Sequence, residues 1–443
     1  MRYSNLKIGK GQRLYRLAKG LIPGGTQLFS KRPEMFLPKL WPAYYQRAKG
    51  CNIWDLDGRS YIDASYMGIG SCILGYADDY VDNAVKKVLN KGSMCTLNCP
   101  EEIELAKILC KIHPWADMVR YARTGGEAMA IAVRIARAKT GKDLVLFCGY
   151  HGWHDWYLAS NLADDKSLDG HLLPGLEPKG VPRSLKGTAI PFKYNDTKEF
   201  LKLINRNKDK IAAVAMEPVR NYYPEKGFLE TIRETTKRLG IVLIFDEVSS
   251  GWRLTVGGAH LKFKIYPDVC VFAKAISNGY PMAAIIGRKK IMQAAQGTFI
   301  SSTYWTERIG PVAALATINK LRFNKVPQYL VKIGKGVQEG WRQLAEKHNL
   351  NITISGIYPL SHFSFNYNNS LMLKTLFTQE MLAKGFLATT AFYASYAHKE
   401  KHIEKYLKAV DETFISIAKS IKEGKPEKYL KGPICHSGFK RLA

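Results

Sequence analysis

The stretch Ile241-Val242-Leu243-Ile244-Phe245-Asp246-Glu247 decides the fold class of this chain. An unbroken apolar run that ends in carboxylates is typical of a strand buried on both faces. Four similar runs, at 144–147, 212–216, 269–272 and 283–286, alternate with stretches of helical pattern. Strands and helices that alternate in this way predict an α/β domain with a mostly parallel sheet.

The two ends of the chain differ from this central part. Residues 48–64 have the pattern of a β-hairpin around an Asp-Gly turn. Apolar residues between Ile403 and Ile421 recur every three or four positions, which predicts a long helix with one buried face. With 443 residues, of which 46% are hydrophobic, the chain is long enough for two or three domains.

The composition limits the classes of partner. The formal net charge of +28 attracts anions, but the basic residues are spread evenly, so we expect no nucleic-acid partner. No apolar run reaches membrane-spanning length and the N-terminus lacks a signal-peptide pattern, so we expect a cytoplasmic protein without a membrane span. Cys95 and Cys99 are the closest cysteine pair, but no second pair or nearby histidine completes a zinc site, so we expect no metal.

Lys274 directly follows the apolar run 269–272. A lysine in such a place is costly unless its charge is paired or removed. Schiff-base formation with an aldehyde removes the charge, and that chemistry needs a lysine of lowered pKa. The alternative is a lysine whose stem is buried and whose ammonium group reaches water.

Two further segments could bind parts of a flat, phosphorylated ligand. Gly125 and Gly126 open a predicted helix, where backbone N–H groups can bind a phosphate, and no P-loop pattern is present. Tyr150 follows the run 144–147 and could stack on a planar ring. Each segment alone is also compatible with an ordinary loop.

Pyridoxal 5'-phosphate (PLP) is the cofactor that would use all these parts together. Its phosphate suits the helix N-terminus, its pyridine ring suits the aromatic side chain, and its aldehyde suits Lys274. Asp246 would keep the ring nitrogen protonated, so that the ring accepts electrons from the substrate Cα–H bond. The amine of Lys274 could then move a proton as general base and acid.

At these residues the chain resembles the class III aminotransferases of fold type I, most of all the glutamate-1-semialdehyde aminomutase branch. The motifs that carry the resemblance are Thr124-Gly125-Gly126-Glu127-Ala128, Tyr150-His151-Gly152, Glu217-Pro218-Val219, Asp246 to Arg253, and Lys274. The resemblance implies a large PLP-binding domain over 66–325. It also implies a smaller α+β domain built from both termini, 1–65 and 326–443.

The resemblance also implies roles around the cofactor ring and phosphate. Gly125 and Gly126 would bind the phosphate, although the family usually has Ser-Gly-Thr at this place. Tyr150 would stack on one face of the pyridine ring, and Val248 would pack on the other. Glu217 matches an acidic position near the phenolic oxygen of the cofactor.

The reacting groups follow from the same motifs. Asp246 would pair with the ring nitrogen and Lys274 would hold the cofactor covalently, with Tyr150 as the third catalytic residue. Thr303 matches a threonine that reaches the phosphate from the other subunit. We therefore expect a homodimer with a shared active site.

Two departures separate the chain from the aminomutases, which have a serine at the position of Trp156 and a glutamate where we align Thr390. We therefore expect an aminotransferase that moves an amino group from an amino acid to an aldehyde or ketone such as a sugar, and we expect glutamate to be the amino donor. Intramolecular transfer of the aminomutase type is the alternative. A nucleic-acid-binding protein that kept the fold but lost the chemistry is a third reading, supported only by charge.

Four residues are candidates for contact with the substrate. Lys31, Arg32 and Arg220 could bind a carboxylate or phosphate, or could form ordinary surface ion pairs. Trp156 is the fourth, since it replaces the serine of the aminomutases.

Overall fold

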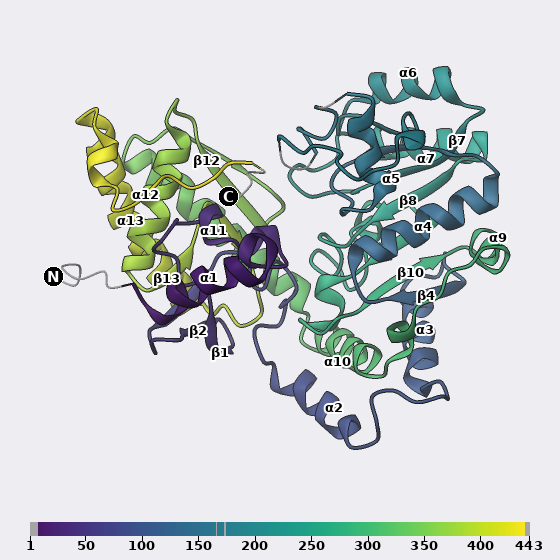
Figure 1. Ribbon diagram of the computed structural model, residues 1–443, viewed down its shortest axis with the longest axis horizontal. Coiled ribbons are helices and arrows are strands. Elements are labelled where there is room, and N and C mark those ends of the chain that lie inside the picture. The colour runs from purple at the N-terminus through teal and green to yellow at the C-terminus, as the bar shows by residue number, and fades with distance from the viewer. Residues whose placement is uncertain (1–7, 165, 172–173, 439–443) are drawn as a thin grey trace. The chain divides into compact units, whose positions relative to one another are not determined.

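The computed structural model describes residues 8–164, 166–171 and 174–438. The chain forms two compact units, one from Met1–Asp78 with Tyr329–Ala443 and the other from Asp79–Gln328 (Figure 1). The sequence-based division lay at 65/66 and 325/326, and the units divide at 78/79 and 328/329. Among the described residues, no helix has the length and apolar character to cross a membrane.

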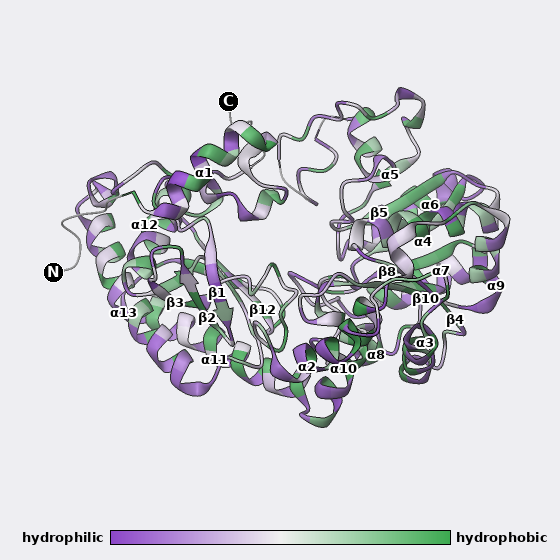
Figure 2. Ribbon diagram, turned by 60° about the horizontal axis from the view of Figure 1, so that its bottom comes forward, coloured by the Kyte–Doolittle hydropathy of each residue, from purple (hydrophilic) through white to green (hydrophobic). Residues whose placement is uncertain are grey.

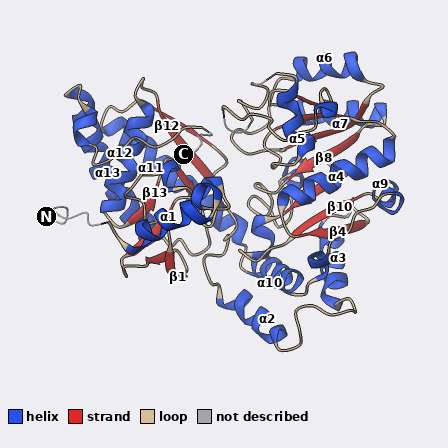
Figure 3. Ribbon diagram, viewed as in Figure 1, coloured by secondary structure: helices blue, strands red, loops and turns tan. Residues whose placement is uncertain are grey.

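A seven-stranded sheet organises the 79–328 unit (Figure 3). Five neighbouring strands, from β9 to β6 in the sheet order, are parallel, and β10 runs antiparallel between β9 and β4. The prediction of an α/β fold with a mostly parallel sheet is therefore confirmed. In sheet order the strands are β4 (Met118–Ala122), β10 (Ala283–Gly287), β9 (Val269–Phe272), β8 (Val242–Asp246), β7 (Ile211–Met216), β5 (Leu144–Cys148) and β6 (Ala189–Pro191).

The sheet is the core of this unit. Every residue of β5, β7, β8, β9 and β10 is buried, and Figure 2 shows the hydrophobic colour along β5 and β8. Each large apolar side chain buried here contributes about 1.5–3 kcal/mol. The helices of the unit are α2 (Asp79–Leu89), α3 (Pro100–Ile112), α4 (Gly125–Thr140), α5 (Asp155–Leu158), α6 (Thr197–Asn207), α7 (Phe228–Leu239), α8 (His260–Phe263), α9 (Lys289–Met292) and α10 (Ile309–Phe323).

The other unit joins the two ends of the chain. Its first sheet has the order β1-β2-β3-β13, with β13 parallel to β3, and its second has the order β11-β12-β14. The strands are β1 (Tyr45–Lys49), β2 (Asn52–Asp55), β3 (Ser60–Ala64), β11 (Ile352–Ser355), β12 (Leu360–Phe365), β13 (Phe386–Ala388) and β14 (Ala391–Tyr393). The helices are α1 (Lys10–Leu21), α11 (Val326–Lys347, which begins in the 79–328 unit), α12 (Ser370–Ala383) and α13 (Glu400–Lys422).

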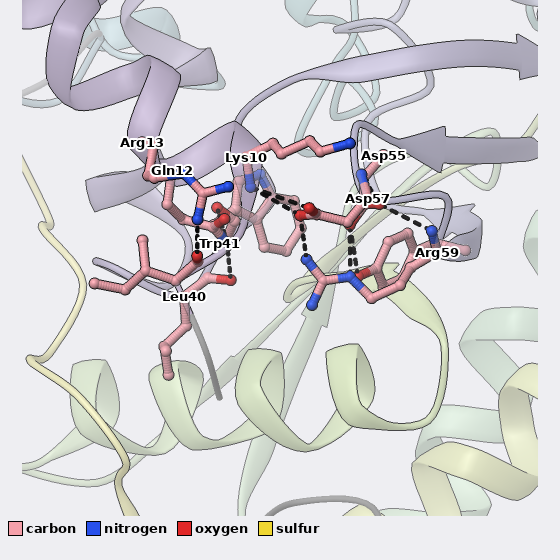
Figure 4. Close-up of polar contacts among 10 residues, drawn as sticks. Lys10, Gln12, Arg13, Leu40, Trp41, Asp55, Asp57 and Arg59 are labelled. Carbon is pink, nitrogen blue, oxygen red and sulfur yellow. Dashed lines mark hydrogen bonds and ion pairs between the residues drawn. The ribbon is translucent and has the colours of Figure 1, made fainter. Parts of the chain in front are cut away.

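The first helix is fixed to the β2–β3 turn by a borrowed cap. Gly9 precedes α1 and has no side chain to cap it, so the backbone N–H of Lys10 donates to the carboxylate of Asp57 at 3.0 and 3.2 Å (Figure 4). Arg59 holds that carboxylate at 3.1 Å and also pairs with Asp55 at 2.9 Å. The Asp-Gly turn that the sequence predicts thus also positions the N-terminal helix.

Candidate active site

The candidate residues gather at one edge of the seven-stranded sheet. Asp246 ends β8, Glu217 directly follows β7, and Tyr150 and Lys274 lie two residues beyond β5 and β9. Because these strands are parallel neighbours, their carboxyl ends meet at the same edge. β4 has the same direction as β9, so the start of α4 at Gly125 belongs to this edge too.

The N-terminus of α4 is suited to an anion. Thr124 and Glu127 form a capping box, in which each side chain bonds the backbone N–H of the other residue, at 3.4 and 2.9 Å. Gly125 and Gly126 are the first two helical residues, whose N–H groups have no acceptor within a helix. Their N–H groups and the positive end of the helix dipole thus lie at the edge where Lys274 lies.

The glycines at this N-terminus allow a close approach of other groups. A Cβ atom added at Gly125 would lie 2.8 Å from Cγ1 of Val248, and one at Gly126 would lie 3.1 Å from Cε1 of His154. A side chain at position 125 would therefore displace Val248. The glycine pair at the start of α4 has a steric reason, besides any role in phosphate binding.

Lys274 has the burial and the lowered pKa that Schiff-base formation needs. Its Nζ donates to Oγ of Ser249 at 2.8 Å, and its backbone is in the left-handed region with φ of 47°, a conformation that costs a non-glycine residue about 1–2 kcal/mol. Burial and, to a smaller extent, the neighbouring guanidinium of Arg220 lower the pKa of Lys274 to about 8, against the carboxylates of Glu217 and Asp246, which raise it. A substantial fraction of the amine is thus neutral near physiological pH.

Asp246 is held by a histidine that we did not single out from the sequence. Oδ2 of Asp246 lies 2.8 Å from Nδ1 of His151, and Oδ1 accepts the N–H of Val248 at 2.9 Å. Nε2 of His151 lies 3.2 Å from the carbonyl oxygen of Cys148. Both ring nitrogens therefore contact oxygen atoms, which fixes the orientation of the ring. His151 stands inside the quoted Tyr-His-Gly motif, which was the available signal.

Glu217 organises the neighbouring side of the edge. It accepts the backbone N–H of Tyr150 at 3.2 Å and pairs with Nη1 of Arg220 at 3.3 Å. Burial raises the pKa of Tyr150, so its hydroxyl stays protonated, although Arg220 opposes the shift. The structure thus brings Arg220 beside Lys274, Tyr150 and Glu217.

Four candidates remain. Trp156 is buried in α5, with its ring stacked on that of His151 at 6.1 Å between centroids. Thr303 is an exposed residue at the start of the 3₁₀ turn Thr303–Thr306. Lys31 and Arg32 belong to the terminal unit, where the Arg32 guanidinium lies 4.9 Å from the centroid of the Phe29 ring.

A second buried polar cluster is centred on Glu247, the residue after Asp246. The carboxylate of Glu247 accepts from the backbone N–H of Ala259 and from the N–H and Nδ1 of His260, at 2.5, 2.9 and 2.6 Å. Trp115 donates to the other ring nitrogen of His260 at 2.9 Å. Although Cys270 is close enough to complete a metal-ligand set, these donors already satisfy the carboxylate, and the cluster is a structural network.

Comparison with known proteins identifies this arrangement. A profile of the family described as "Aminotransferase class-III" matches residues 38–409. The chain belongs to the class III aminotransferases. It is 34% identical over 435 residues to glutamate-1-semialdehyde 2,1-aminomutase from Methanocaldococcus jannaschii, covering 92% of this chain and 99% of that protein.

One other relative supports the same family, and a solved structure shows the same fold. The chain is 30% identical over 429 residues to 3-aminobutyryl-CoA aminotransferase from Cloacimonas acidaminovorans, covering 94% and 99% of the two chains. Its fold matches the PLP-containing FumI protein of Sphingopyxis sp. MTA144 with a TM-score of 0.85 at 23% identity, covering 95% and 100%. The predicted family and fold type are confirmed, and so is PLP as the cofactor of this class III aminotransferase.

The groups of this class III aminotransferase fit PLP chemically. Lys274 supplies an amine of lowered pKa, Asp246 a buried carboxylate with a fixed orientation, and α4 an N-terminus without side chains in its first two positions. These are the partners that an aldehyde, a pyridinium nitrogen and a phosphate require.

Proposed function

We propose that this class III aminotransferase transfers an amino group from an amino acid, with glutamate as the expected donor, to a small aldehyde or ketone such as a sugar. The observation that carries the proposal is the pairing of an easily deprotonated Lys274 with the His151-held carboxylate of Asp246 at one sheet edge. PLP, when bound, supplies a ring that accepts electrons from the substrate Cα.

In this proposal each residue at the sheet edge has a separate role. Lys274 holds the cofactor and moves the proton at the substrate Cα, and Asp246 keeps the ring nitrogen protonated. Gly125 and Gly126 bind the phosphate through backbone N–H groups. Tyr150 and Val248 would pack on the two faces of the ring, and Glu217 would lie near its phenolic oxygen. The proposed cofactor-binding residues are therefore Gly125, Gly126, Tyr150, Glu217, Asp246, Val248, Lys274 and Thr303.

Arg220 is our candidate for binding the carboxylate of the amino donor. Its guanidinium pairs with Glu217 at 3.3 Å and is close enough to Lys274 to lower the pKa of that lysine. A guanidinium can bind a carboxylate through two parallel hydrogen bonds. Lys31 and Arg32 remain candidates for an anionic group of the acceptor, and Trp156 would act on the site through its packing on His151.

We also propose a homodimer in which Thr303 reaches the phosphate of the partner subunit. Thr303 is exposed, and it lies next to Tyr304, of which 70% is exposed. Leu97 and Phe299 are 79% and 83% exposed in the same unit. Where such side chains lie next to one another, they form the apolar patches that are typical of interaction surfaces. The expected location is the cytoplasm.

The aminomutase alternative is favoured by the 34% identity to a protein of that name. Trp156 and Thr390 argue for intermolecular transfer, because aminomutases have a serine and a glutamate at these positions. The backbone of Thr390 pairs with Phe363 at 2.9 Å.

An absorbance titration tests the proposal. The purified protein should show a band near about 420 nm that moves toward about 330 nm when L-glutamate is added, and an added oxo acceptor should restore the first band. Lys274→Ala should lose the shift. The aminomutase would be established instead if the absorbance band did not move with any amino donor and the protein formed product from glutamate-1-semialdehyde alone.

A further inference from the structure

The sheet edge opposite to the candidate active site carries a cavity of about 540 Å³, a size typical of small-ligand pockets. The sheet contributes the start of β8, the segment before β9 and the residues after β10. The C-terminal ends of α4 and α7 complete the lining. Figure 1 shows α4, α7 and α9 around this part of the unit. Since β8 has five residues, the cavity lies about 15 Å from the edge that carries Asp246.

The lining of the cavity is strongly cationic. The helices contribute Lys139, Arg233 and Lys237, and the loop after α4 contributes Lys142. Lys264 and Arg288 lie in loops at the sheet edge, and Lys290 lies in the short helix α9. The one carboxylate in the lining, Asp268, is already bound to Arg233 at 3.0 Å and lies 3.5 Å from Arg288.

The helix ends account for only part of this charge. α4 and α7 both end here, at Thr140 and Leu239, and each C-terminus carries about half a negative charge, which lysines commonly offset. Two such ends and one carboxylate amount to about two negative charges, against seven cationic side chains. Within the described part of the chain, Lys139, Lys237, Lys264 and Lys290 form no ion pair.

Lys264 adds an independent observation. Its φ is 57° in the left-handed region, at the C-cap of α8, where glycine or asparagine is the usual residue. A lysine there costs about 1 kcal/mol or more of backbone strain. The neighbouring Tyr266 is 41% exposed and also lines the cavity, so its ring can stack on a flat group.

We propose that this cavity binds a small ligand with a chain of two or more phosphate groups, such as a nucleoside triphosphate or inorganic tripolyphosphate. Seven cations within one concave surface match several negative charges held close together. The volume suits a small ligand and not a long polymer, and Tyr266 offers a stacking surface for a base. The site is separate from the edge at which substrate chemistry is proposed.

Calorimetric titration of the PLP-saturated protein with tripolyphosphate and with ATP, at about 0.1 M salt, tests the proposal. We expect one site per chain and at least about five-fold weaker binding in Lys264→Gly and Lys290→Gln, in line with the loss of one charge-assisted contact. Lys264→Gly should not lower the unfolding temperature, because glycine relieves the backbone strain. Equal affinity for both probes would show that the phosphate chain alone is recognised. If ATP binds more tightly than tripolyphosphate and Tyr266→Leu removes that difference, the site also recognises the base.

Lys325→Gly is the matched control, because Lys325 is also an exposed lysine with positive φ (48°) in the same unit but lies outside the cavity. It removes the same charge and should leave the affinity unchanged. Absence of binding up to about 1 mM of either probe, or equal weakening in Lys325→Gly, would overturn the proposal. So would binding of RNA oligonucleotides alone, with an affinity that grows with their length.

Discussion

Nδ1 of His151 lies 2.8 Å from Oδ2 of Asp246, and both side chains are almost fully buried, at 1% and 3% exposure. The contact joins the loop after β5 to the end of β8, two strands that are separated in the sheet by β7. A hydrogen bond to a charged group in such surroundings contributes about 1.5–3 kcal/mol. His151 therefore determines how the carboxylate of Asp246 is oriented.

Replacing His151 should impair the reaction without unfolding the protein. His151→Leu should lower kcat/KM by about 10- to 150-fold, the equivalent of one such hydrogen bond, mainly through kcat. His151→Asn should recover part of the loss, because the asparagine amide can donate from the place of Nδ1. Steady-state kinetics and the absorbance band of the cofactor report both effects.

The control for this prediction is a histidine–carboxylate pair in the terminal unit. Nε2 of His348 lies 2.6 Å from Oδ1 of Asp411. His348→Leu should leave the kinetics and the absorbance band unchanged. Equal losses in His151→Leu and His151→Asn would show that His151 acts by packing alone.

The pH dependence of cofactor capture should report the pKa of Lys274. A lysine reacts with an aldehyde only as the neutral amine, so the rate at which apoprotein captures PLP should rise with pH around a midpoint of about 8. Arg220→Met should move the midpoint upward, since it removes a cation that lowers this pKa and leaves the Glu217 carboxylate, which raises it. Stopped-flow absorbance across pH 6–10, a range of roughly two units either side of the midpoint, measures both curves.

Arg206→Met is the control for that experiment, because Arg206 is an exposed residue of α6. The same midpoint in all three proteins would contradict the influence of Arg220 on Lys274.

A methyl group at Gly125 should weaken cofactor binding. The new Cβ would lie 2.8 Å from Val248, so either the N-terminus of α4 or the Val248 side chain must move. We expect Gly125→Ala to raise the dissociation constant of PLP at least about ten-fold, from about 1.4 kcal/mol of lost contact. Gly336→Ala, in α11 with no atom within 4 Å of the added carbon, should instead stabilise the fold by about 0.5–1 kcal/mol. Unchanged PLP affinity in Gly125→Ala would contradict the prediction.

The Glu247 cluster should be important for stability rather than for chemistry. Glu247→Gln would place an amide N–H₂ group against backbone donors, at a cost of about 2–4 kcal/mol, and should lower the unfolding temperature by about 5–10 °C. Burial alone would raise the pKa of Glu247, but the hydrogen bonds that it accepts from His260 and Ala259 lower it below the usual 4.5. The ionised carboxylate therefore stabilises the fold above pH 4.5, and this contribution is lost as the pH falls through the lowered pKa.

Thermal unfolding of Glu247→Gln, with the exposed α7 variant Glu234→Gln as control, checks this prediction. The two variants should differ at pH 7 and become similar in acid. Equal unfolding temperatures at pH 7 would be the contrary result.

Much of the fold and part of the site could be predicted from local pattern. Buried parallel strands need apolar residues at every position, so the runs that became β5, β7, β8, β9 and β10 are visible in the sequence. The order of strands and helices in turn determines that parallel strand ends share an edge. Asp246 and Lys274 could therefore be named together before any coordinates were known.

Only the tertiary structure decided which side chains meet. His151 and Asp246 are 95 residues apart, the Glu217–Arg220 pair lies beside Lys274, and the cationic cavity collects side chains from Lys139 to Lys290 that look evenly scattered in the chain. Periodicity records which face of an element is buried, because that depends on neighbours within a few residues. Partners across a sheet depend on strand order and register, which no local pattern contains.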